Sequence, residues 1–464
     1  MGALEKRLSG LPADIVRTAP EDLASHLTDW RGAKQGRAEM LLLPRNTSDV
    51  VEIVRWAAAN RVGLVPQGGN TGLVGGSVPE PDPSGPVAVL SLRRMDAISP
   101  ADPAGLSMVA EAGAILANVH TAAEAAGCRF PLSLGARGSA TVGGLVSTNA
   151  GGVQVLRHGN MRSLVLGLEA VLPDGSILDQ LTALRKDNTG YDIKQLLIGA
   201  EGTLGVVTRV ALKLSPALAH RSIGWAGLAS PKEALALLKR LRAAAGEVVE
   251  SFELMAGAAV ELTFDHAPNI RPPLAGAHDY HVLIELGAKA SVLESVLAAA
   301  IEAGEVQDAT IAQSETQGEA FWSIRETIPE AEKRQGKTIK NDISIAVADL
   351  PAFHAEALAL LQQKYPGARP FVFGHLGDGN LHWNIRVPVD APEGWLATEG
   401  EAARISLHDL LMRYRGSISA EHGIGTLKAA ELGRLGNPGK LAAMRAIKSA
   451  LDPLGIMNPG KLFA

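Results

Sequence analysis

Apolar side chains recur along this chain at spacings that indicate alternating helices and strands. Over 47–58 the apolar positions follow helical spacing, and Thr47 or Ser48 has the side chain expected of an N-cap. Shorter apolar runs between Gly- and Pro-containing turns fit strands. The pattern predicts strands at 63–66, 87–92, 107–112 and 205–214, a helix at 116–126 and a hairpin from 165 to 178. Residues 1–216 are therefore expected to form a mixed α+β domain.

The pattern changes after residue 216, where glycine becomes rarer and the helical periods become longer. It predicts helices at 231–245, 291–303, 316–335 and 351–365, and strands at 280–287, 338–346 and 371–386. Helices that alternate with strands indicate one sheet with helices on a face. We assign this region to a second domain, 217–410. The segment 411–464 is again rich in glycine and follows as a third part of the chain.

The composition is that of a globular protein with more than one domain. Of 464 residues, 46% are hydrophobic and 20% are charged. The net charge of −5 comes without any basic block, so a nucleic-acid partner is not expected. The single cysteine, Cys128, cannot form an intrachain disulfide. The start, MGALEKRLSG, lacks the apolar stretch of a secretory signal, and no apolar run is long enough to span a bilayer, so we expect a cytoplasmic protein.

Three separate segments concentrate glycine with small polar residues. They read PQGGNTGLVGGS at 66–77, GARGSATVGGLVSTNAGG at 135–152 and GAEGTLGVVT at 199–208. Glycines at this density let backbone N–H groups approach an anion such as a phosphate. None of the segments is G-x-G-x-x-G, so a Rossmann-type NAD site is not indicated. Three such segments in one chain favour a large phosphate-containing ligand over simple turns.

Two histidines and a glutamate near the C-terminus have the chemistry of metal ligands. His375 and His382 flank the turn-forming sequence LGDGNL, and a hairpin there would bring the two imidazoles together on one face. Glu421, in SAEHGIG, would supply a carboxylate. Two imidazoles and one carboxylate form an open site for a divalent ion, which the sequence leaves open among Zn, Mn, Fe and Co.

These motifs, in this order, closely resemble the vanillyl-alcohol-oxidase-type (PCMH-type) flavoproteins. HLGDGNLHWN, SAEHGIG and LDPLGIMNPGK resemble the D-2-hydroxyglutarate and D-lactate dehydrogenase branch, and the resemblance covers about residues 40–464. It implies an α+β fold with a two-part FAD-binding domain over 1–216. It further implies a cap domain with a large antiparallel sheet over 217–410, and a C-terminal segment, 411–464, that returns to the flavin domain.

The resemblance also implies which residues bind FAD. The first glycine-rich loop has Asn70 where some relatives have a histidine that attaches FAD covalently, and Cys128 lies outside the motifs, so we expect non-covalent FAD. The implied FAD contacts come from the three segments, from their flanks and from the C-terminal tail: Pro66, Gly68, Gly69, Asn70, Thr71, Gly72, Ser77, Ser133, Gly135, Gly138, Thr141, Gly144, Asn149, Gly151, Glu201, Gly202, Val207 and Asn458.

For the substrate, the resemblance implies a D-2-hydroxy acid whose hydroxyl and carboxylate approach the metal. His422 would take the hydroxyl proton, since a neutral imidazole titrates in the right range. Arg325, Lys340 and Asn384 would bind the rest of the substrate. Pro329 stands where relatives specialised for 2-hydroxyglutarate can carry a threonine. D-2-hydroxyglutarate is therefore expected first, followed by D-malate, D-lactate or glycolate.

Two other classes of function compete with this interpretation. A non-redox flavoprotein of the same superfamily, similar to alkylglycerone-phosphate synthase, would have no evident use for the His/His/Glu group. A metallohydrolase would need H-E-x-x-H or a second carboxylate cluster, and the chain has neither. The resemblance implies an electron-transfer flavoprotein or a quinone as electron acceptor. A homodimer is the commonest oligomeric state for such a chain.

Overall fold

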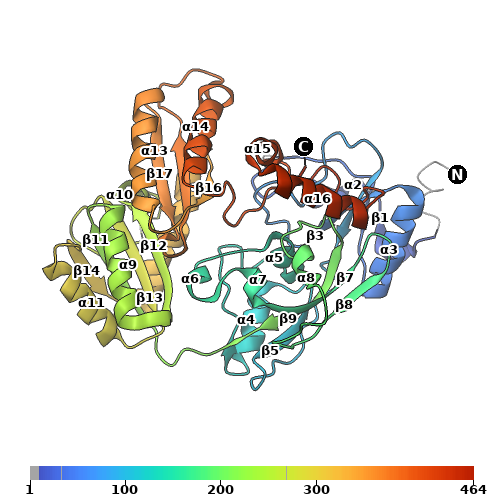
Figure 1. Ribbon diagram of the computed structural model, residues 1–464, viewed down its shortest axis with the longest axis horizontal. Coiled ribbons are helices and arrows are strands. Elements are labelled where there is room, and N and C mark those ends of the chain that lie inside the picture. Colours follow the sequence, from blue (N-terminus) through green and yellow to red (C-terminus); the bar gives the residue numbers. More distant parts are fainter. Residues whose placement is uncertain (1–9, 33, 268, 464) are drawn as a thin grey trace. The chain divides into compact units, whose positions relative to one another are not determined.

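The computed structural model describes residues 10–463 except 33 and 268. Two compact units divide the chain, and each contains more than one stretch of it (Figure 1). Unit 1 comprises the described residues of 1–152, 159–217 and 421–464, and unit 2 comprises 153–158 and those of 218–420. No helix in the described part of the chain is long and apolar enough to cross a membrane. The predicted absence of a secretory signal concerns residues 1–9, which lie outside the described residues.

Unit 1 contains two four-stranded sheets with different strand directions. In the first, with order β1-β2-β4-β3, the strands β2, β4 and β3 run parallel. The second has the order β5-β9-β7-β8 and is antiparallel throughout. Every residue of β4 is buried, as expected of a parallel strand that is covered on both faces. The strands are β1 (Val16–Arg17), β2 (Met40–Leu42), β3 (Gly63–Gln67), β4 (Val87–Ser91), β5 (Ser107–Glu111), β6 (Cys128–Arg129), β7 (Val165–Val171), β8 (Ile177–Gln180), β9 (Val206–Lys213) and β10 (Ser215–Pro216).

The two helices predicted in unit 1 both form, as α3 and α4, with one correction at a helix start. The N-cap of α3 is Asn46, one residue before the predicted Thr47, because the Asn46 side chain accepts a hydrogen bond from the Asp49 N–H. The apolar face of α3 packs into the core of the first sheet. The helices are α2 (Pro20–Leu23), α3 (Thr47–Asn60), α4 (Leu116–Glu124), α5 (Val142–Thr148), α7 (Met161–Leu164), α8 (Lys194–Leu197), α15 (Ala429–Leu435) and α16 (Pro438–Leu451).

The C-terminal tail lies beside the first sheet of unit 1. Leu64 of β3 donates its N–H to Ile456, and Asn458 donates its N–H to Leu64, which forms a short parallel bridge. The side chains of Ile456 and Met457 complete the core under α3. This confirms that the C-terminal segment returns to the predicted flavin domain. Residues 411–420 remain with unit 2, because α14 continues to Arg413 and Ser417 pairs with Ser344.

Unit 2 is built on one eight-stranded antiparallel sheet, which confirms the predicted cap-domain architecture. Its order is β14-β11-β13-β12-β17-β18-β15, with β16 also paired to β18. The single strand predicted at 338–346 is divided into β15 and β16, and both pair with β18. The strands are β11 (Ser222–Leu228), β12 (Val249–Ala256), β13 (Tyr280–Leu286), β14 (Asp308–Ile311), β15 (Thr338–Ile339), β16 (Asp342–Ser344), β17 (Arg369–Gly374) and β18 (Asn380–Arg386).

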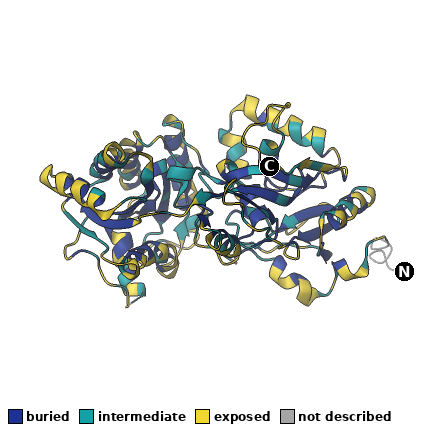
Figure 2. Ribbon diagram, turned by 90° about the horizontal axis from the view of Figure 1, so that it is seen from below, coloured by how far each residue is buried: buried dark blue, intermediate teal, exposed yellow. Residues whose placement is uncertain are grey.

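Helices cover both faces of this sheet, whereas the sequence pattern indicated a single covered face. Side chains alternate between the faces of a strand. Accordingly, Ile223 of β11 lies against Gly318 of α12, and the next residue, Gly224, lies under Leu293 of α11. Strands are largely buried in both units, while the helices carry the exposed residues (Figure 2). The helices of unit 2 are α6 (Val155–His158), α9 (Pro231–Ala245), α10 (Gly257–His266), α11 (Ala290–Glu302), α12 (Glu315–Arg334), α13 (Leu350–Lys364) and α14 (Glu399–Arg413).

Candidate active site

The first glycine-rich loop packs directly on the second in unit 1. A Cβ atom on Gly68 would lie 2.1 Å from the Thr141 Oγ1, and one on Gly69 would lie 1.9 Å from the Ser139 carbonyl oxygen. No side chain fits at either position, so two of the predicted flavin segments are in contact because these residues are glycines. Thr71 and Gly72 follow in the same loop.

Asn70 and Ser77 hold the first loop in shape. Asn70 has a φ of 56°, in the left-handed region, and its side-chain amide donates to the Thr28 carbonyl oxygen at 2.8 Å. Its side-chain oxygen accepts from the Ser77 hydroxyl at 2.9 Å. Both side chains therefore have partners inside the loop region. If Asn70 and Ser77 contact FAD as predicted, they would do so through their backbone atoms or in addition to these hydrogen bonds.

The second segment combines open backbone with a buried hydroxyl. A Cβ on Gly135 or Gly138 would meet no heavy atom within 4 Å. The Thr141 hydroxyl, just before α5, is buried and has no hydrogen-bond partner among the described residues. Buried polar atoms are usually bonded, so an orphaned hydroxyl beside a glycine loop fits a polar ligand. Of the other predicted contacts here, Gly144 lies within α5, and Asn149 ends this helix with its side chain accepting from the Arg162 N–H. Ser133 lies just before the segment, and Gly151 lies near its end.

The third segment and the C-terminal tail join the first loop. The side-chain amide of Asn458 donates to the Gly76 and Glu201 carbonyl oxygens, at 2.9 and 2.6 Å. A Cβ on Gly202 would lie 3.1 Å from Pro66, so these two residues are also neighbours. Val207 is buried in β9. Unit 1 therefore brings together all four stretches that were predicted to hold FAD.

Glu201 is bonded within the protein in a way that the sequence did not reveal. Its carboxylate oxygens accept hydrogen bonds from the N–H groups of Ile424 and Gly425, each at 2.7 Å. Burial raises the pKa of Glu201, although these two N–H groups oppose the shift. The bonds tie the loop that follows Glu421 and His422 to the third glycine-rich segment. Glu421 and His422 are neighbours in this loop, with the closest oxygen–nitrogen pair 3.7 Å apart.

In unit 2 the predicted hairpin forms and brings the two histidines together. His382 lies in β18 opposite Phe373 of β17, and His375 directly follows β17. The two imidazole centroids are 5.8 Å apart. The His375 Nδ1 lies 2.6 Å from the Glu253 carboxylate, so a neutral His375 that donates from Nδ1 has Nε2 in the acceptor form that a metal needs.

Asp342 accompanies this pair of histidines and was not among the predicted site residues. It lies in β16 opposite His382, and its Oδ1 is 3.9 Å from the His382 Nδ1. The same oxygen accepts from the Asn380 side-chain amide at 2.9 Å. The alternation of the segment TIKNDISI places Asp342 on the same strand face as Lys340, which was a usable signal.

Each of the three predicted substrate-binding side chains in unit 2 is bonded to a fully buried carboxylate. Arg325 donates from Nε to Glu253 at 2.9 Å, and its guanidinium lies 4.9 Å from the centre of the Phe373 ring. Lys340 and Asn384 both donate to Glu332. Burial would raise the pKa of Glu253, but His375 and Arg325 outweigh it and hold that pKa below its ordinary value.

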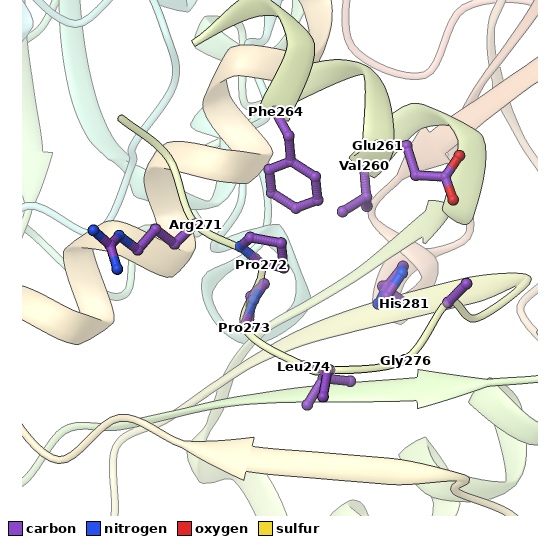
Figure 3. A pocket seen from close by; sticks show the side chains of 11 residues that line it. Val260, Glu261, Phe264, Arg271, Pro272, Pro273, Leu274, Gly276 and His281 are labelled. Carbon is purple, nitrogen blue, oxygen red and sulfur yellow. The ribbon is translucent and has the colours of Figure 1, made fainter. Parts of the chain in front are cut away.

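A pocket of about 680 Å³ elsewhere in unit 2 holds none of the predicted residues. Figure 3 shows Val260 and Phe264 projecting from α10 toward a loop with Pro272, Pro273 and Leu274. His281 is its one histidine, and burial lowers the pKa of His281 to about 4. The His281 imidazole accepts a hydrogen bond from the Trp225 indole N–H, which indicates a structural role in the core and not a catalytic one.

Comparison with known proteins agrees with this geometry. Residues 38–180 match the FAD binding domain family, and residues 218–462 match the C-terminal domain of FAD linked oxidases. The chain belongs to the FAD-linked oxidase family. The chain is 38% identical to the mitochondrial D-2-hydroxyglutarate dehydrogenase of Arabidopsis thaliana, over 95% of its own length and 78% of the relative. It is 37% identical to the D-2-hydroxyglutarate dehydrogenase of Xanthomonas citri pv. viticola, over 98% and 95%.

A third relative and two solved structures are also similar to this chain. The D-2-hydroxyglutarate–pyruvate transhydrogenase of Saccharomyces cerevisiae is 34% identical, over 96% of this chain and 90% of the relative. p-Cresol methylhydroxylase superimposes with a TM-score of 0.76 at 14% identity, covering 99% of this chain and 96% of its own. Alkyldihydroxyacetonephosphate synthase gives 0.73 at 16% identity, covering 98% and 85%. The solved structures establish the fold of this chain, and the predicted family and fold are confirmed.

Proposed function

We propose that this protein is an FAD- and divalent-metal-dependent dehydrogenase that oxidises a D-2-hydroxy acid to the 2-oxo acid, with D-2-hydroxyglutarate as the first candidate. The observation that carries the proposal is the pair of imidazoles of His375 and His382 in the same unit as Arg325 and Lys340. Relatives that carry the name D-2-hydroxyglutarate dehydrogenase align over nearly the whole chain, which supports the choice of substrate. D-malate, D-lactate and glycolate follow as alternatives.

His375, His382 and Glu421 are the proposed metal ligands. Two imidazoles suit a borderline divalent ion, with zinc proposed first and manganese, iron or cobalt as alternatives. Glu421 follows directly on a segment that belongs to the same sheet edge, because Ser419 pairs with Asp342 and Ala420 donates its N–H to the Asp342 carbonyl oxygen. The peptide chain therefore supports Glu421 as the third ligand. Asp342 is a candidate to support His382.

FAD would be held without a covalent bond by the glycine-rich loops and Asn458 of unit 1. The Thr141 hydroxyl and the Asn458 side-chain oxygen have no hydrogen-bond partner within the described part of the chain, and both fit a polar cofactor. When bound, FAD would supply a two-electron acceptor, and the metal would supply a Lewis acid for the substrate hydroxyl. We propose residues 1–216, 217–410 and 411–464 as the flavin, substrate and returning segments, with the exception that 153–158 and 411–420 pack with unit 2.

The remaining chemistry falls to side chains of this chain. His422 is the proposed base, which takes the proton from the substrate hydroxyl oxygen. Arg325 and Lys340 would bind substrate carboxylates, the first through paired N–H groups and the second as a point charge. Pro329 lies inside α12 and has no N–H for the Arg325 carbonyl oxygen four residues earlier. This position would therefore influence the choice between dicarboxylates.

The location and partners of the enzyme stay proposals. We propose an electron-transfer flavoprotein or a quinone as acceptor, a homodimer as the assembly, and the cytoplasm as the location. The two histidines favour this function over a non-redox flavoprotein similar to alkylglycerone-phosphate synthase, and over a metallohydrolase.

The absorbance spectrum of the purified protein tests the proposal. It should be that of FAD, which should leave the polypeptide on acid precipitation. Anaerobic D-2-hydroxyglutarate should bleach the flavin, and the L-isomer should not. A colourless protein, or equal bleaching by L-lactate, would overturn the assignment.

A further inference from the structure

Two of the completely buried carboxylates in unit 2, Glu253 and Glu332, each connect two of the proposed site residues. Glu253 lies in β12, and its two oxygens bond to different partners: Oε1 to the His375 Nδ1 and Oε2 to the Arg325 Nε. Glu332 lies in α12 and accepts from both Asn384 and Lys340. Neither carboxylate was part of the proposed binding machinery itself.

Stability alone is a weak reason for these pairs. Ion pairs that are removed from water lose much of their attraction to the cost of desolvation, and apolar residues of similar volume often serve as well. Arg325 lies in α12, Glu253 lies in β12 and His375 directly follows β17, so the bonds are long-range in sequence. Such an arrangement fits a role in fixing the direction of the side chains that it holds.

Glu253 determines which nitrogen of His375 can bind a metal. Because a carboxylate only accepts, the imidazole must donate from Nδ1, and Nε2 then carries the lone pair. The second oxygen engages the Nε of Arg325, so the two terminal amino groups of that guanidinium stay outside this bond. One carboxylate thus sets both a proposed ligand and a proposed substrate contact.

Glu332 acts on the other two side chains. The Asn384 amide nitrogen lies 3.1 Å from both oxygens of Glu332, and the Asn384 side-chain oxygen accepts from the Asn341 N–H at 2.9 Å. Both ends of this amide are bonded to protein, which makes Asn384 a part of the frame around Lys340. Lys340 uses one of its three donors on Glu332.

We propose that Glu253 and Glu332 are positioning residues of the active site, with separate tasks. Glu253 fixes the metal-binding form of His375 and the direction of Arg325, and Glu332 fixes Lys340 through a frame shared with Asn384. The inference rests on the proposed function and goes beyond it, since neither residue touches substrate or metal in its assigned role.

The substitutions Glu253→Gln and Glu332→Gln separate the two tasks. A glutamine at 253 that accepts from Arg325 must donate to the His375 Nδ1, which moves the imidazole proton to Nε2. In the opposite orientation of the glutamine amide, its NH₂ group would face the Arg325 Nε–H, so that two donors would oppose each other. We expect Glu253→Gln to weaken Zn²⁺ binding by the metal-free protein about 10–100-fold and to raise KM for D-2-hydroxyglutarate. Glu332→Gln should raise KM and leave Zn²⁺ binding as in the wild type.

Glu285→Gln is the matched control. Glu285 is also buried in this sheet and bonded to an arginine, Arg221, but it contacts none of the proposed site residues. Zn²⁺ affinity is measured by competition with a chromophoric chelator, together with FAD content, unfolding midpoint, KM and kcat. The control should lose stability without any change in Zn²⁺ affinity or KM.

The outcomes keep the two proposals apart. If the wild type binds no Zn²⁺ and D-2-hydroxyglutarate leaves its flavin oxidised, the proposed function fails. Suppose instead that the wild type binds Zn²⁺ and that D-2-hydroxyglutarate reduces its flavin. The positioning roles are then wrong if Glu253→Gln binds Zn²⁺ as well as the wild type does, or if all three variants change Zn²⁺ affinity and KM in parallel with stability. Should Glu253→Gln not fold, Glu253→Asp keeps the charge but falls one methylene short, and it should show the same weaker Zn²⁺ binding.

Discussion

The two units would form their proposed ligand sites by opposite means. In unit 1 the site is made by leaving side chains out: Gly68 and Gly69 allow the first loop to touch the Ser139–Thr141 segment, and Gly135 borders open space. In unit 2 the site is made by charged side chains that buried carboxylates hold in place. Unit 1 should therefore be damaged by added atoms, whereas unit 2 should be damaged by removed charges.

The largest expected effect concerns His422, which does not fit the comparison between the two units. His422 belongs to unit 1, yet the proposed function gives it proton transfer. His422→Ala should retain FAD and Zn²⁺ but lower the rate of flavin reduction by about 10²–10⁴-fold. The wild-type rate should rise with pH through one ionisation, because only the neutral imidazole accepts a proton, and the variant should lose that ionisation.

Stopped-flow reduction by D-2-hydroxyglutarate, together with metal analysis, measures this effect. Glu421→Ala and His382→Ala are the comparison variants, which should lose metal instead. Activity of His422→Ala that returns at high Zn²⁺ concentration would make His422 a ligand.

The next effect contrasts two glycines of unit 1. A Cβ on Gly69 would lie 1.9 Å from a carbonyl oxygen, whereas a Cβ on Gly135 would meet nothing within 4 Å. Gly69→Ala should lower the free energy of unfolding by about 1–3 kcal/mol and reduce the FAD retained per chain. Gly135→Ala should change the free energy of unfolding by less than about 0.5 kcal/mol. Denaturant titration and flavin absorbance check both, and equal losses would show that crowding of the first loop is not the cause.

The third effect contrasts two arginines of unit 2. Arg325→Ala removes a cation that is proposed to bind substrate, so KM should rise by about tenfold or more while kcat changes less. Arg271 is exposed and lines the pocket of Figure 3, so Arg271→Ala should leave both constants unchanged. Steady-state kinetics with D-2-hydroxyglutarate decide the case. A rise in KM for Arg271→Ala alone would move the substrate site to that pocket.

The sequence predicted the local parts of both sites. The glycine-rich segments were recognisable because each is continuous in the chain. His375 and His382 were correctly expected to be neighbours, because a turn with Gly377 and Gly379 fixes the hairpin.

The partnerships of unit 2 could not be predicted in this way. Glu253 bonds to Arg325 and His375, which are 72 and 122 positions away in the chain. No period in a single segment encodes such a contact. The only local sign was the presence of two carboxylates, Glu250 and Glu253, inside VESFELMA, where seven of eight side chains are buried. The N-cap of α3 is Asn46 and not Thr47. The sequence pattern could not decide between them, since both residue types are good N-caps.

The smallest effect concerns a buried lysine of unit 1. Lys461 is buried and donates to Glu80, which also accepts from Lys34. Burial lowers the pKa of Lys461 to about 8. Between pH 8 and the ordinary lysine pKa of about 10.4, the unfolded chain holds this proton and the folded protein does not, so this residue makes stability rise with pH.

In Lys461→Met that contribution is absent, while Lys34 still pairs with Glu80. From pH 8 to 10 the urea midpoint of the wild type should therefore rise relative to that of Lys461→Met. From pH 6 to 7.5 the difference between the two midpoints should stay constant. Lys232→Met, at an exposed site on α9, should give a difference that does not depend on pH over this range. A constant difference for Lys461→Met would mean that Lys461 keeps its proton in the folded protein over this pH range.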